Sequence, residues 1–180
     1  MVEPNNFYMI NEQEFIASVN EMIATRELEL EYEDIEEEIP VFEDLKSFEQ
    51  FFWKKTSITF CDFRPMAPIV PSPRGIVHVG SYASMDDTII PDYFSEESRA
   101  IWSHLDGERG FPLFFKDEYQ VLLNDLDLAQ QRVAQIDVIP LCNLDRSIHE
   151  ELSEFLDEIV PKAKEAIEAG YADAMAIWWG

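Results

Sequence analysis

Cysteine and histidine are the residue types of this chain that could supply a nucleophile or a metal site. A cysteine thiolate beside a histidine base can act as a nucleophile, and Cys61 with His78 is the pair that would form such a centre. Neither Cys61 nor Cys142 stands in a CxxC motif, and the histidines show no HxH or HExxH spacing. The sequence therefore predicts reduced, buried thiols and a structural histidine, with no metal and no cofactor.

Neighbouring carboxylates are the second possible source of chemistry. Asp86 and Asp87 are adjacent and could bind a divalent cation or exchange protons, although adjacent aspartates more often begin a turn or a helix. Residues 124–127 (NDLD) resemble a calcium-binding loop, but they lack its glycine and lie in a helical pattern. We predict no catalytic residue, and a hydrolase that uses Cys61 or Asp86/Asp87 ranks last among the functions considered.

The densest group of charged side chains lies between residues 27 and 50, which hold eleven carboxylates and one base. Glutamates alternate there with Leu28, Leu30 and Tyr32, and this period of two predicts a half-buried strand with an acidic outer face. Glutamate also favours helix, so an extension of the preceding helix remains the alternative. Carboxylates on such a strand lie about 7 Å apart, which approximates the phosphate spacing along one nucleic-acid strand. The predicted partner-binding residues are Glu27, Glu29, Glu31, Glu33, Asp34, Glu36, Glu37 and Glu38.

The overall charge restricts the classes of partner. The 180 residues include 37 acids and 13 bases, for a formal net charge of −24. This balance disfavours direct binding to nucleic acid or to an anionic membrane, and it favours a basic protein partner. Solubility alone is the alternative reading of the acidity, and adaptation to high salt is a third. With no signal peptide and no membrane-length apolar run, the sequence predicts a cytoplasmic protein.

Hydrophobic periodicity predicts helices and strands in irregular alternation. Asn11 and Glu14 form a capping box for the first helix, with Ile10 and Phe15 as its hydrophobic staple. A second helix begins at Pro40 and carries Val41, Leu45, Phe48 and Phe52 on one face; later helices begin at Ser95, Asp117 and Ser147. The predicted strands are 27–33, 57–63, 75–83, 113–115 and 136–141.

The last helix and the strand at 75–83 carry the most specific expectations. Pro161 is expected to kink the helix or to begin a new one, and Gly170 is expected to end it. In the strand, Val77 and Val79 are expected on one face, with Ile76, His78 and Tyr82 on the other. Together these elements predict a single compact α+β domain over residues 1–180, with a mixed or mainly antiparallel sheet and about five helices.

These observations favour a non-enzymatic acidic protein that occludes a basic surface of a protein partner. An immunity protein or antitoxin acting on a nuclease-like toxin is one form of this hypothesis, and a nucleic-acid mimic that blocks a DNA-binding enzyme is another. The alternative is a chaperone or adaptor that binds an apolar client segment through exposed aromatic side chains. The candidates for that role are Phe51, Trp53 and Trp178.

Overall fold

A computed structural model describes residues 5–25, 40–54, 73–82, 95–97, 113–136 and 143–179. The acidic segment 27–38 and the predicted strand 57–63 lie outside these ranges. So do four of the residues considered for chemistry, namely Cys61, Asp86, Asp87 and Cys142.

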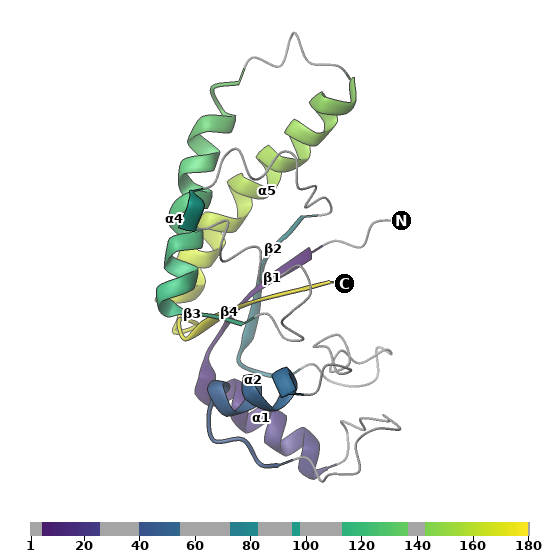
Figure 1. Cartoon of the computed structure of the whole chain (residues 1–180), viewed down its shortest axis with the longest axis vertical. Coiled ribbons are helices and arrows are strands. Elements are labelled where there is room, and N and C mark those ends of the chain that lie inside the picture. The colour runs from purple at the N-terminus through teal and green to yellow at the C-terminus, as the bar shows by residue number, and fades with distance from the viewer. Residues whose placement is uncertain are drawn as a thin grey trace.

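The described strands form one antiparallel sheet. They are β1 (Asn5–Ile10), β2 (Ile76–Tyr82), β3 (Leu113–Phe115) and β4 (Ala174–Trp179). Their order is β2-β1-β4-β3, so the first and last strands of the chain are paired at the centre (Figure 1). The α+β class and the antiparallel sheet predicted from the sequence are confirmed, and the sheet and helices form one compact body. None of the described helices combines the length and apolar character that crossing a bilayer requires.

Helices cover both faces of the sheet. Helices α4 (Lys116–Val133) and α5 (Asn143–Glu168) run side by side along one face, and α1 (Glu12–Ala24) and α2 (Leu45–Lys54) lie together at one end of the molecule (Figure 1). Phe7 and Met9 of β1 join the core beneath α4 and α5, whereas Ile10 joins the core formed with α1 and α2. Successive side chains of a strand point to opposite faces, so this split assigns the two helix pairs to opposite sides of the sheet.

A bulge in β2 changes which residues face α5. The register passes from Phe7↔Gly80 to Tyr8↔His78, so Val79 is the extra residue. Val79 and Tyr82 consequently lie in the same core, and the Tyr82 ring lies 5.1 Å from that of Phe155 on α5. The prediction that Tyr82 faces away from Val79 is therefore wrong, because alternation along one strand does not reveal a bulge.

The first helix begins and the last helix ends as predicted. The Asn11 side chain accepts a hydrogen bond from the Glu14 N–H at 3.0 Å, and Asn11 is the N-cap of α1. At the other end of the chain, Gly170 has a φ of +98° and its N–H donates to the Ile167 carbonyl. The Tyr171 N–H donates to the Ala166 carbonyl, which completes a Schellman motif at the end of α5.

Three predicted helix starts differ from the structure. Helix α2 begins at Leu45 and not at Pro40, because Asp44 caps it by accepting from the Ser47 N–H at 2.7 Å. Val41 precedes the helix and is 79% exposed, so its predicted place on the buried face is wrong. Helix α4 begins directly after β3 without an Asp117 cap, and α5 begins at Asn143, one turn before the predicted Ser147 cap.

Helix α5 also continues through Pro161. The proline removes one backbone hydrogen bond, but Ile159, Val160 and Ala163 around it remain buried against the sheet. Packing of this face maintains the helical path where the local sequence favours a break, so the alternative in which a new helix begins at Pro161 is wrong.

Candidate functional site

The predicted partner-binding residues Glu27, Glu29, Glu31, Glu33, Asp34, Glu36, Glu37 and Glu38 lie outside the described residues. Their role and the strand predicted for them therefore stay predictions. The described chain stops before this segment at Thr25, the C-cap of α1, and resumes after it at Pro40.

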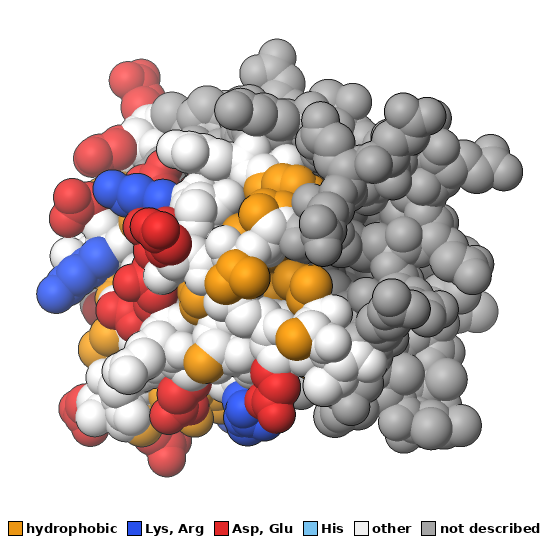
Figure 2. All heavy atoms as spheres, turned by 90° about the horizontal axis from the view of Figure 1, so that it is seen from below, with side chains coloured by type: hydrophobic (Ala, Val, Ile, Leu, Met, Phe, Trp, Pro, Cys, Tyr) orange, Lys and Arg blue, Asp and Glu red, His pale blue; other side chains and the backbone are white. Residues whose placement is uncertain are grey.

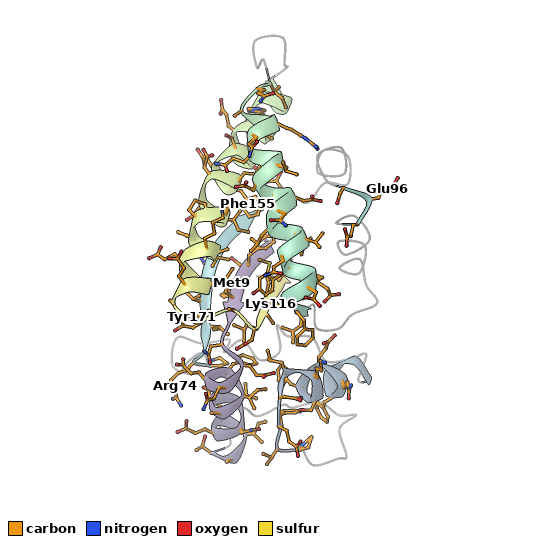
Figure 3. The ribbon with its side chains drawn as sticks, turned by 90° about the vertical axis from the view of Figure 1, so that its left-hand side faces the viewer. Met9, Arg74, Glu96, Lys116, Phe155 and Tyr171 are labelled. Carbon is orange, nitrogen blue, oxygen red and sulfur yellow. The ribbon has the colours of Figure 1, made fainter. Side chains whose placement is uncertain are left out.

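The outer side of α5 is an acidic surface that the structure describes. Its carboxylates recur at helical spacing opposite the buried stripe formed by Leu152, Phe155, Leu156 and Ile159. We call these seven exposed residues the acidic ridge: Glu150, Glu151, Glu154, Asp157, Glu158, Glu165 and Glu168. Phe155 points from α5 into the molecule, so the ridge and the core occupy opposite sides of this helix (Figure 3).

Only part of the ridge is neutralised within the described part of the chain. Lys162 forms an ion pair with Glu158, and the Gln130 amide donates to the Asp157 carboxylate at 2.7 Å. The other lysine of the helix, Lys164, lies 3.6 Å from Asp127 on α4. In the described ranges the ridge members without an ion pair are Glu150, Glu151, Glu154, Asp157, Glu165 and Glu168.

This arrangement works against the stability of the helix. Like charges three or four residues apart, such as Glu150 and Glu154, destabilise a helix by about 0.2–0.5 kcal/mol per pair. Glu165 and Glu168 lie near the C-terminus of α5, where the helix dipole favours cations, and the last turn holds no base. The helix is therefore stabilised by its buried face and not by its surface charges.

The excess of acidic side chains is not restricted to α5. Acidic side chains also outnumber basic ones among the described side chains of the face shown in Figure 2.

A hydrogen-bonded chain of three side chains lies on β1 and β2. The Ser81 hydroxyl donates to the Asn6 side-chain oxygen at 2.6 Å, and His78 Nε2 lies 2.8 Å from the same hydroxyl. Because the hydroxyl gives its one proton to Asn6, the imidazole is the donor toward Ser81 and not its base. The Tyr8 ring meets the His78 ring edge-on at 5.3 Å.

Electrostatics around His78 favour its neutral form. Burial of the ring lowers the pKa of His78, the positive charge of Lys162 lowers it further, and Glu158 partly opposes both. His78 thus has a hydrogen bond and a ring contact within the protein, while Cys61, the other member of the pair considered as a nucleophilic centre, lies outside the described residues. Asn6 and Ser81 were not predicted, and the signal that would have found them is their pairing across β1 and β2.

The residues once compared with a calcium loop have a structural role. They lie within α4 as predicted, and the buried Asp125 carboxylate accepts from the backbone N–H and the hydroxyl of Ser95 at 2.9 and 2.6 Å. Asp125 thus anchors residues 95–97 against α4. Across the described ranges, no group of three His, Cys, Asp or Glu side chains is arranged to hold a metal ion.

The aromatic residues proposed for client binding are described in part. Phe51 is half-buried, packs on the core of α1 and α2, and meets the Phe42 ring edge-on at 5.5 Å. The side chains of Trp53 and Trp178 lie outside the described part of the structure. Phe51 therefore contributes to the protein's own core, at least on the side that faces Phe42.

Comparison of the chain with protein-family models, with curated proteins and with solved structures finds no match.

Proposed function

We propose that this protein is a non-enzymatic acidic binding protein that occludes a basic surface of a protein partner. The observation that carries the proposal is the acidic ridge, an incompletely neutralised row of carboxylates on a well-packed helix. The ridge adds to the charge of residues 27–38, which we propose as the main contact. An immunity protein, an antitoxin or a nucleic-acid mimic would use its surface in this way.

The mechanism is electrostatic attraction followed by occlusion. The net charge of −24 would steer a basic partner toward the protein and raise the rate of encounter, most strongly at low ionic strength. The carboxylates would then pair with the lysine and arginine side chains that the partner uses to hold phosphates. A nucleic acid could not reach that surface while the acidic protein covers it.

Solubility alone is the competing explanation, and the placement of the charges favours a binding role. A surface of mixed sign keeps a domain soluble, and interspersed bases would also stabilise helix α5. In the ridge, by contrast, like charges stand three and four residues apart and glutamates approach the helix C-terminus. A binding role accounts for a charge distribution that works against folding.

The test compares variants of equal net charge. Glu29/Glu31/Glu33→Gln neutralises the proposed contact, Glu150/Glu151/Glu154→Gln neutralises part of the ridge, and Gln13/Gln120/Gln131→Lys adds the same charge at exposed positions elsewhere. Each bait is used for pull-down from lysate at about 0.05 M and about 0.5 M sodium chloride. Association rates are then measured by stopped flow with the partner identified by mass spectrometry.

We expect the first variant to associate about tenfold more slowly at low salt, the ridge variant less so, and the lysine variant least. High salt should release the partner from the unaltered protein. Equal effects of all three variants would mean that only the net charge matters and that neither acidic surface is a specific contact. Salt-insensitive binding with a negative heat-capacity change would indicate an apolar client instead and would overturn the proposal.

A further inference from the structure

We draw no further inference here: the strongest candidate, the hydrogen-bonded chain of Asn6, Ser81 and His78 on strands β1 and β2, carries none because the Ser81 hydroxyl gives its proton to Asn6 and not to the imidazole, and the described residues around it form no metal-binding group.

Discussion

Gly75 is the residue at which the backbone leaves least room. Its φ is +79°, and a Cβ atom built on it would lie 2.3 Å from the backbone nitrogen of Phe15 on α1. Its carbonyl also accepts the Asn11 N–H at 2.8 Å, beside the start of the same helix. Gly75→Ala should therefore lower the free energy of unfolding by about 2–4 kcal/mol, through the left-handed conformation and the backbone clash together.

Gly170 provides the matched control for this substitution. Its φ is also positive, at +98°, but the nearest atom to a built Cβ is the Asn11 side-chain nitrogen at 3.9 Å. Gly170→Ala should cost only about 1–2 kcal/mol, which is the conformational penalty without a clash. Urea unfolding measures both variants, and equal losses would show that close packing against α1 does not set the requirement at Gly75.

Protonation of His78 should destabilise the fold in mild acid. Burial lowers the pKa of His78 below its ordinary value of 6.5, so the unfolded chain takes up the proton first as the pH falls. The stability linked to neutral His78 is thus fully present above about pH 6.5 and is lost as the pH falls toward the folded-state pKa. Unfolding free energies of the unaltered protein and of His78→Gln should be compared between about pH 7 and pH 5.

The glutamine variant should lose less stability over that interval, because its side chain does not titrate. Carboxylates titrate mostly below this range and affect both proteins alike. Parallel pH profiles for the two proteins would contradict the lowered pKa of His78. A steeper profile for the variant would mean that the pKa of His78 is raised in the folded protein.

Local rules recovered the residue contacts that are close in sequence. Asn11 and Gly170 were both predicted, because a cap bonds to a backbone group only a few residues away. The Asn20 amide bonds both backbone groups of Phe42, and Asp125 anchors Ser95, yet neither pair has a sequence signature. Such long-range partners are determined by packing and could not be read from spacing.

At the scale of the elements, Pro161 is a site where the helix is less stable than it could be. It lies exposed within α5, lacks an N–H for the helical ladder and restricts the residue before it. Pro161→Ala should raise the free energy of unfolding by about 2 kcal/mol, since a proline costs about 3 kcal/mol in a helix but also restricts the unfolded chain.

Urea unfolding and circular dichroism measure this effect, with Lys162→Ala as an exposed control on the same turn. The control removes a partly exposed ion pair to Glu158 and should change stability by less than about 1 kcal/mol. A loss of stability in Pro161→Ala would mean that the proline shapes the packing of α5 on the sheet.

The sequence identified most described elements but misplaced several of their boundaries. Helical periodicity found α1, α4 and α5, and alternation found β2, because burial imposes those periods, while the apolar run Leu113–Phe115 suggested β3. The start of α2 was misplaced because a local pattern pointed to Pro40, whereas Asp44 caps the helix. The bulge that turns Tyr82 toward α5 arises from the pairing of β2 with β1, so it could not be predicted from the sequence of β2 alone.

At the scale of the whole molecule, the charge should make stability depend on salt. With a net charge of −24, mutual repulsion opposes the compact state, and the Debye length shortens from about 10 Å at 0.1 M to about 3 Å at 1 M. The urea midpoint should therefore rise as sodium chloride is added. In Glu150/Glu151/Glu154→Gln the rise should be smaller, because part of the repulsion has been removed.

A salt-independent midpoint in both proteins would show that the carboxylates are too well solvated to repel one another.

The acidic site could be predicted from the sequence only in part. Composition revealed the acidity, whereas the ridge on α5 was not among the predicted partner-binding residues. Which carboxylates gain a partner could not be predicted, because Lys164 reaches across to Asp127 on another helix.

The strand order has a consequence for synthesis of the protein. Strand β3 pairs with β4 alone among the described strands, and β4 also occupies one side of β1. A nascent chain on the ribosome cannot assemble this sheet before residues 174–179 have left the exit tunnel, however long its first helix has been formed. Until then the edge of β1 that pairs with β4 has no partner strand, and the chain cannot complete the centre of its sheet.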